Sequence, residues 1–315
     1  MEMQQAGHPS MDDTLRILMV GNSFCYYYVE ELYGLLMANP DPNRGYNAVQ
    51  IYNLYYTGCT LTRHYDWWIN GGSEYQLYKT DAAGRNELPP SKEWTLEAAL
   101  AHAPWDYISL QGTVKGGNYS KDETSVLAAA ICEKAAPLLD RFHQLHPHAQ
   151  LLWHRTWPFE VGRISGETVY TAEMLEKYDA GMQKVCNYMC TEFPKTRSYT
   201  LTQVNSGAAW VEARIQNAKL DTSLLPHGGL CARLKISNPK TFTGARNGEI
   251  NAGDAYHDGD IGGGQFLNAC VWYETLTGQS CLNNPYKPDL SNGNYVLSDE
   301  LLVLLRNAAH KTVHG

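Results

Sequence analysis

The sequence lacks any long hydrophobic run. Crossing a bilayer as a helix takes roughly 18–20 consecutive apolar residues. The longest candidates here, Ile17–Val20 and Val126–Ile131, are far shorter. The sequence therefore predicts no membrane-spanning helix. The first residues, MEMQQAGHPSMDD, are polar and acidic and do not resemble a secretory signal peptide. We expect a cytoplasmic protein by default, and an exported one if a leader has been removed.

Clusters of basic residues are also lacking. The chain of 315 residues carries 25 Lys and Arg against 33 Asp and Glu, a formal net charge of −8. Nucleic-acid-binding proteins need clustered cations to neutralise phosphates. The composition therefore argues against a nucleic acid as partner.

The third absence is a C-x-x-C pair. Eight cysteines are scattered along the chain. In a chain of this length, such scatter favours buried free thiols over a disulfide framework. A Cys231–Cys281 disulfide stays open as an alternative for an exported protein.

Five short runs rich in apolar or β-branched residues are typical of strands that are covered on both faces. They are Leu15–Gly21, Ala48–Tyr55, Tyr107–Gln111, Gln150–Thr156 and Ser198–Val204. Helical patterns lie between and after these runs. They are Val29–Ala38, Glu123–Gln144 with a kink or break expected at Pro137, Thr171–Phe193, Ala208–Ala218, Gly264–Thr277 and Leu301–Ala309.

Strands that alternate with helices predict a parallel sheet with right-handed crossovers. We therefore expect a three-layer α/β/α sandwich around a central parallel sheet of about five strands. Residues 1–14 would be a tail and residues 15–315 a single domain. Two stretches rich in Gly, Pro and polar residues, 70–92 and 220–253, are expected to be loop insertions.

The ends of the predicted strands carry the candidate chemistry. In an open parallel sheet, ligands bind at the carboxyl ends of the strands. Ser23 follows the first strand, Gly58 follows the second, and Gln111 closes the third. Ser23 can be a nucleophile at the lip of the sheet, or an ordinary helix N-cap.

A serine nucleophile needs a base, and the base needs an orienting acid. Asp254 and His257 stand three residues apart before the helical pattern at Gly264. In a loop, this spacing allows the carboxylate to hold one imidazole nitrogen while the other faces the serine. Asp254 with Asp258 and Asp260 also suggests a calcium site, but the EF-hand spacing is absent.

An oxyanion hole needs donors that point at the developing negative charge. The backbone N–H groups of Ser23 and Gly58, with the side-chain amide of Gln111, are the predicted donors. The alternative for Gly58 is a plain turn glycine, and for Gln111 an amide that caps a neighbouring loop.

These blocks resemble those of the SGNH (GDSL-like) hydrolase superfamily. Gly21-Asn22-Ser23-Phe24 resembles the nucleophile block, Thr57-Gly58-Cys59 the second block and Asp254-Ala255-Tyr256-His257 the final D-x-x-H block. Gly262 also stands where that family tends to have a glycine opening its last helix. The resemblance implies a flavodoxin-like sheet and ester hydrolysis without a metal or cofactor, commonly deacetylation of carbohydrates.

Two positions depart from the family pattern. Asn22 stands where many members have aspartate, and Gln111 stands near the place of an asparagine that serves the oxyanion hole. Gln111 can offer the same N–H donor from a longer side chain.

The chain has many aromatic residues, which stack on sugars but more often fill cores. Tyr26 and Trp157 lie closest in sequence to the proposed site and are the predicted substrate-binding residues. His143, His146 and His148 resemble a metal cluster, but they straddle a helix end and are interpreted as a solvated terminus.

The sequence thus predicts a serine esterase with a Ser23–His257–Asp254 triad. Its expected substrate is a small-molecule or glycan ester, with acetyl on a sugar as the first candidate. The alternatives are a carbohydrate-binding protein with a decayed oxyanion hole and a lipase- or thioesterase-type serine hydrolase.

Overall fold

The computed structural model describes residues 12–112, 121–162, 164–165, 168–169, 171–235, 249–251, 257–289 and 296–315. A seven-stranded sheet forms the centre of the molecule, in the order β4-β3-β2-β1-β5-β6-β9. Five of these strands are parallel, namely β1 (Thr14–Gly21), β2 (Ala48–Tyr55), β5 (Tyr107–Gly112), β6 (Gln150–Arg155) and β9 (Leu201–Asn205). The order of the parallel strands is that of a flavodoxin-like sheet.

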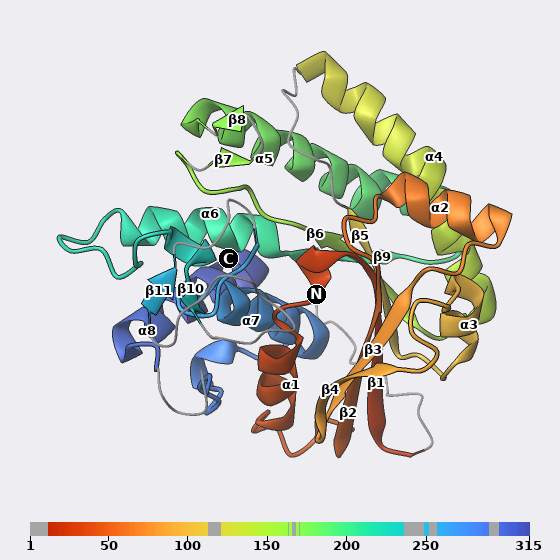
Figure 1. Cartoon of the computed structure of the whole chain (residues 1–315), viewed down its shortest axis with the longest axis horizontal. Helices are drawn as coiled ribbons and strands as arrows, with labels where there is room; N and C mark the ends of the chain where they lie inside the picture. Colours follow the sequence, from red (N-terminus) through yellow and green to blue (C-terminus); the bar gives the residue numbers. More distant parts are fainter. Residues whose placement is uncertain are drawn as a thin grey trace.

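The long helices connect and cover these strands (Figure 1). They are α1 (Val29–Met37), α2 (Leu61–Asn70), α3 (Leu96–Ala101), α4 (Lys121–Leu145), α5 (Ala172–Asn187), α6 (Ser206–Asn217), α7 (Gly264–Thr277) and α8 (Asp299–His314). Short 3-10 turns lie at Ser23–Cys25 (η1), Phe193–Thr196 (η3), Gly229–Cys231 (η4) and Cys281–Asn283 (η5), and a π-helical turn (η2, Tyr188–Glu192) extends α5. Two small hairpins, β7 (Ile164–Ser165) with β8 (Thr168–Val169) and β10 (Arg233–Lys235) with β11 (Glu249–Asn251), stand apart from the main sheet.

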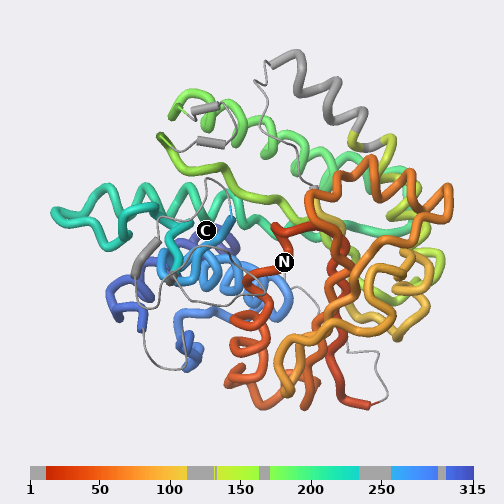
Figure 2. Tube along the Cα trace, in the orientation of Figure 1, coloured from red at the N-terminus to blue at the C-terminus, as the bar shows by residue number. Residues whose placement is uncertain are grey.

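The two faces of the sheet carry separate hydrophobic cores. Alternate residues of a strand point to opposite faces. In β1, Ile17 and Met19 join the core with α1, α6, α7 and α8, whereas Leu18 and Val20 join the core with α2, α3, α4 and the end of α5. Figure 2 shows the chain trace, with these two groups of helices on either side of the strands. The predicted α/β/α sandwich is therefore confirmed.

The structure differs from the sequence prediction at three places. Residues 70–92, expected to be a loop insertion, instead contain the antiparallel hairpin β3 (Gln76–Asp81) and β4 (Gly84–Leu88), which extends the sheet beyond β2. Helix α4 runs through Pro137, so of the expected kink or break the break is wrong. The helices α2 and α3 were not predicted. Of the other expected insertion, residues 236–248 and 252–253 lie outside the described residues.

The strand register brings the candidate blocks to one edge of the sheet. Gly21 pairs with Tyr55, and Val20 pairs with Leu110. The turn after β1, the turn after β2 and the last residues of β5 therefore lie at the same level, at the carboxyl ends of adjacent strands. This is the edge at which open α/β sheets bind ligands.

Two observations bear on the remaining expectations. All seven described cysteines are free, as predicted; Cys132 is not among them. Among the described helices, none has both the length and the apolar character that a bilayer crossing requires.

Candidate active site

Ser23 begins the turn that leaves β1. Asn22, the last extended residue, caps the 3-10 turn η1 by accepting a hydrogen bond from the Phe24 N–H. The Asn22 carbonyl then accepts from the Cys25 N–H at 3.0 Å. The sequence left open whether Ser23 is a nucleophile or a helix N-cap. In the structure, the N-cap of this turn is Asn22. The serine side chain is therefore not used as a cap.

The Ser23 hydroxyl lies next to an imidazole from the far end of the chain. Its Oγ is 2.7 Å from His257 Nε2, across a sequence separation of 234 residues. Ser23 is 8% exposed and His257 is half-buried. The contact has the length of a strong hydrogen bond and the spacing required of a nucleophile and its base.

A glycine-rich segment places His257. The N–H of Gly259 donates to the Leu230 carbonyl and that of Gly262 to the Ala232 carbonyl, both at 2.9 Å. A Cβ on either glycine would stand 2.0–2.1 Å from a backbone oxygen of residues 229–232. Glycine at these two positions therefore allows the His257 segment to lie directly against η4.

Asn22 links the three neighbouring blocks. Its Nδ2 donates to the Cys59 carbonyl at 2.8 Å, in the turn after β2. Its Oδ1 accepts from Gln111 Nε2 at 2.9 Å, and its backbone N–H donates to Gln111 Oε1 at 3.3 Å. Asn22 and Gln111 are both buried. An aspartate could not donate to Cys59, so the amide at position 22 has a physical reason in this chain.

This linkage predicts a cost for Asn22→Asp. The carboxylate would face the Cys59 carbonyl with no N–H to donate. Two buried acceptors that face each other without a hydrogen bond lower the stability of the fold by about 1–3 kcal/mol. We expect the free energy of unfolding to fall by that amount in urea titrations at pH 7. Asn283→Asp, at an exposed asparagine, is the matched control. Equal stability of Asn22→Asp and the wild type would contradict the linkage.

The backbone N–H groups of Ser23 and Gly58, the predicted oxyanion donors, both lie in turns at the carboxyl edge of the sheet. Ser23 opens η1, and the first N–H groups of a helix have no partner within it. Gly58 is exposed in the turn after β2 and adopts a φ of +63°, which favours glycine. In the part of the chain that the structure describes, no acceptor is found for either N–H.

Gln111 lies at the same edge, but one hydrogen of its amide is used in the bond to Asn22. Through this bond Gln111 holds the residue before the nucleophile. Its direct contribution to an oxyanion hole stays a prediction.

Aromatic rings surround His257. The Phe24 ring lies 5.8 Å and the Tyr27 ring 5.2 Å from the imidazole, measured between ring centroids. The guanidinium of Arg233 lies over Tyr27 at 5.1 Å. Sequence reasoning missed Tyr27, because nothing in the run Tyr26-Tyr27-Tyr28 tells which ring faces the histidine.

The two predicted substrate-binding aromatics have different surroundings. Trp157 is 0% exposed, with its ring stacked on Trp210 at 4.9 Å and tilted against Phe24 at 5.0 Å. Because Trp157 has no accessible face, the prediction that it contacts substrate is wrong for this structure. Its ring packs against Phe24 instead. Tyr26 is half-buried and packs against Tyr27, Tyr55 and Tyr78, with Arg85 over its ring at 4.3 Å.

The acid of the predicted triad, Asp254, lies outside the described residues. Its neighbour Asp258 is buried, and its Oδ2 accepts a hydrogen bond from Asn268 of α7 at 3.1 Å. Asn268 in turn accepts from the Trp210 indole N–H at 2.8 Å. Asp258 therefore fastens the His257 segment to α7. Asp260 accepts from its neighbouring Ile261 N–H.

Two cysteines near Ser23 are poor rival nucleophiles. Burial raises the pKa of the Cys25 thiol to about 12, and it raises that of Cys59 to about 12 as well. Thiol chemistry depends on the thiolate. At neutral pH both side chains are therefore thiols without nucleophilic strength.

A second serine–histidine pair lies at the carboxyl end of β6. Ser206 Oγ is 3.2 Å from His154 Nε2, and both side chains are fully buried. Burial lowers the pKa of His154 to about 3. Water and substrate cannot reach this buried pair, so it cannot serve as a catalytic nucleophile and base.

The predicted solvated histidines have separate partners. His143 Nε2 lies 3.2 Å from the Ser198 hydroxyl, and His146 Nε2 lies 2.8 Å from the Leu100 carbonyl. His148 is exposed.

Comparison with known proteins gives a family and a fold. No curated protein matches the sequence. A crystal structure of a DUF4886 family protein from Bacteroides uniformis is similar, with a TM-score of 0.64, 23% identity and coverage of 96% of this chain and 95% of that chain. A gut microbial diltiazem-metabolizing enzyme has a TM-score of 0.48 and 12% identity over 85% of this chain and 48% of that chain. An extracellular lipase from Streptomyces rimosus has a TM-score of 0.38 and 10% identity over 84% of this chain and 99% of that chain.

The last two similarities are too weak to support an argument about this chain, and the first concerns the fold alone. The model of the family described as "Domain of unknown function (DUF4886)" matches residues 16–187, which is more than half of the chain and contains both Ser23 and Gln111. This protein therefore belongs to the DUF4886 family.

Proposed function

We propose that this protein is a serine esterase of the SGNH type that removes small acyl groups, acetyl first among them, from a carbohydrate or a similar neutral alcohol. The observation that carries the proposal is the 2.7 Å contact between Ser23 Oγ and His257 Nε2 at the carboxyl edge of the sheet. The N-terminal turn of η1 and the exposed Gly58 support it, because they offer N–H donors at the same edge of the sheet.

The reaction would begin with transfer of the Ser23 proton to His257 Nε2 as Oγ attacks the ester carbonyl. The N–H groups of Ser23 and Gly58 would stabilise the oxyanion, and each such donor is worth about 3 kcal/mol of barrier. The imidazolium then gives its proton to the leaving alcohol, and an acyl group remains on Oγ. Water, deprotonated by His257, hydrolyses this acyl-enzyme and restores the serine. Asp254 would hold the proton on Nδ1, and Gln111 would fix Asn22 and add a third donor.

The surroundings of the serine favour a small acyl group. Phe24 is buried beside Ser23 and is itself held by Trp157 and Phe159. We infer that this ring packing restricts the space for a long acyl chain on this side of Ser23. The half-buried Tyr27 lies beside His257, with Tyr26 packed against it and the cation of Arg233 over its ring, which gives an aromatic and polar surface there. Rings of this kind stack on sugar faces and donate hydrogen bonds to hydroxyls.

The proposal predicts a steep dependence on acyl length. We expect kcat/KM to fall at least about tenfold from p-nitrophenyl acetate to the butyrate and again to the octanoate, because each unaccommodated group costs about 1–3 kcal/mol. We also expect release of acetate from acetylated xylo-oligosaccharides, measured by an acetate assay.

Two results would contradict this specificity. Preference for the octanoate would favour a lipase-type hydrolase. Binding of the oligosaccharides without release of acetate, together with inactivity on every p-nitrophenyl ester, would favour a carbohydrate-binding protein.

A further inference from the structure

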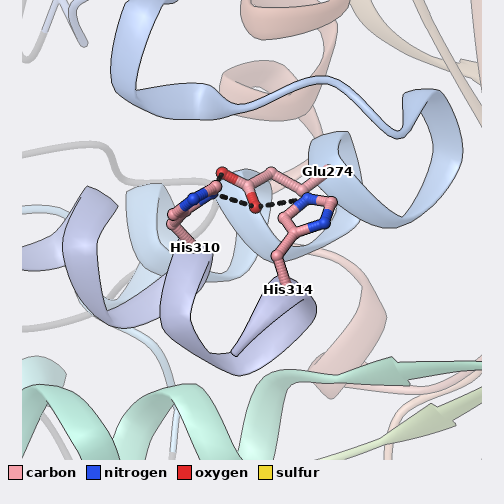
Figure 3. A group of neighbouring side chains, drawn as sticks. All are labelled: Glu274, His310 and His314. Carbon is pink, nitrogen blue, oxygen red and sulfur yellow. Dashed lines mark hydrogen bonds and ion pairs between the residues drawn. The ribbon is translucent and has the colours of Figure 1, made fainter.

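A cluster of one carboxylate and two imidazoles lies outside the proposed active site. Glu274 belongs to the last turn of α7, and His310 and His314 belong to the last two turns of α8. Figure 3 shows the two imidazoles converging on the carboxylate from the neighbouring helix. The histidines are four residues apart, so they lie on one face of α8, one turn above the other.

The donor atoms have the spacing of metal ligands. Glu274 Oε2 lies 3.2 Å from His310 Nδ1 and 3.1 Å from His314 Nε2, and the three donor atoms lie within 4.8 Å of one another. Ligands on a tetrahedral ion with bonds of about 2.0–2.2 Å stand about 3.3–3.6 Å apart. Small side-chain rotations would therefore place all three around one ion.

We propose that Glu274, His310 and His314 bind a divalent transition-metal ion of the Zn²⁺ class. The ligand set of imidazole nitrogens with one carboxylate oxygen suits Zn²⁺ and its neighbours in the first row better than Ca²⁺ or Mg²⁺, which take oxygen ligands. Three protein ligands leave a fourth position for water. The Ser280 hydroxyl lies 3.2 Å from His310 Nδ1, beside the ligand cluster.

The burial of Glu274 gives an independent reason for a cation. Its side chain is 0% exposed, and a buried carboxylate is costly unless it is paired. In the described part of the chain, its ion-pair partners are these two histidines, and the Cys281 N–H donates to it at 2.7 Å. A divalent ion bound by the three side chains would compensate the charge of this buried carboxylate.

Access to the site is open from one side. The side chains of His310 and His314 are 36% and 31% exposed, so an ion can reach them from solvent. The bound ion would bridge the ends of α7 and α8. Glu274 lies ten residues beyond Gly264, about 15 Å along α7 from the end that follows His257. We therefore assign the ion a stabilising role and no part in the ester reaction.

The test uses the full chain, freed of metal by chelation, with ZnCl₂ added in calorimetric and thermal-unfolding titrations. The wild type should bind one Zn²⁺ at this site and unfold at a higher temperature with Zn²⁺ than without. His314→Gln should weaken this binding at least about tenfold and abolish the rise in unfolding temperature. His148→Ala, at an exposed histidine outside the cluster, is the matched control and should behave as the wild type.

His314→Gln is chosen because the residue is partly exposed and glutamine can still donate to Glu274, so the variant should fold. His310→Ala provides a second removal of a ligand. Co²⁺ gives a further readout, since its visible absorption in the wild type should be lost in both variants. All of these variants keep Ser23 and His257, so an ion bound there would appear equally in each. Titrations of His314→Gln and His310→Ala that match the wild type, or a wild type that binds no Zn²⁺, would overturn the proposal.

Discussion

Ser23→Ala should reduce kcat for p-nitrophenyl acetate by about 10⁴- to 10⁶-fold, because removal of the nucleophile from a serine hydrolase abolishes the acyl-enzyme route. The hydroxyl is the group that His257 Nε2 contacts at 2.7 Å, and alanine leaves the imidazole without a proton to accept. The Asn22 cap does not use the serine side chain, so the variant should keep the fold. The measurement is the steady-state rate, corrected for spontaneous hydrolysis.

Ser206→Ala is the matched control for this result. Ser206 is also hydrogen-bonded to a histidine at the same sheet edge, but the pair is fully buried. We expect its kcat to stay within a few-fold of the wild type. A fluorophosphonate reagent should label Ser23 and leave Ser206 unlabelled, as read by peptide mass spectrometry. Equal rates for the wild type and Ser23→Ala would remove the esterase proposal.

The layered fold was predictable from the sequence because parallel strands have a strong local signature. Ala48–Tyr55 and Gly264–Thr277 are predicted with the bounds that the structure has. Both segments are apolar along most of their length, and both are buried. Burial on several sides imposes a continuous apolar pattern that local periodicity can detect.

The hairpin β3–β4 was missed for the opposite reason. It lies at the edge of the sheet, and its strand β4 (Gly84–Leu88) is mostly polar and partly exposed. Edge strands are stabilised by pairing with a neighbour more than by their own composition. The hairpin's apolar contacts come from Leu77, Tyr78 and Leu88, which do not make a recognisable pattern.

The candidate site was predictable only as far as the motifs reach. Strand order and register bring Ser23, Gly58 and Gln111 to one edge, and this follows from the rule for parallel sheets. The approach of His257 depends on glycines that let its segment lie against η4, which is a contact of tertiary structure. Trp157 was misjudged because closeness in sequence says nothing about which face of a ring is covered.

The amide of Asn22 makes a hydrogen bond that an aspartate at this position could not make. From the sequence alone, the amide was only a difference from aspartate. In the structure it donates to Cys59, accepts from Gln111 and caps η1. A carboxylate can do the last two but not the first. The pairing with Gln111 also explains why this strand end carries a long amide, since its two atoms reach both the Asn22 side chain and the Asn22 backbone.

Asp254 and Asp258 are the two candidates for the acid that orients His257, and replacing the acid that does so should cause a large loss of kcat. Asp258 is buried and accepts from Asn268, which makes it a fastening of the His257 segment to α7. We therefore expect Asp254 to be the acid that holds the His257 tautomer. Asp254→Asn should lower kcat by about 10⁴-fold with little change in stability, because an asparagine favours the wrong tautomer of the base.

Asp258→Asn is the paired variant, and it should show the reverse pattern. An asparagine can still accept from Asn268, so kcat should stay within about tenfold of the wild type, while the free energy of unfolding changes by about 1–3 kcal/mol. Both quantities are measured on both variants, by p-nitrophenyl acetate hydrolysis and by urea titration. A loss of kcat confined to Asp258→Asn would reassign the triad to Ser23, His257 and Asp258. Loss in neither variant would mean that the Ser23–His257 pair works without an orienting acid.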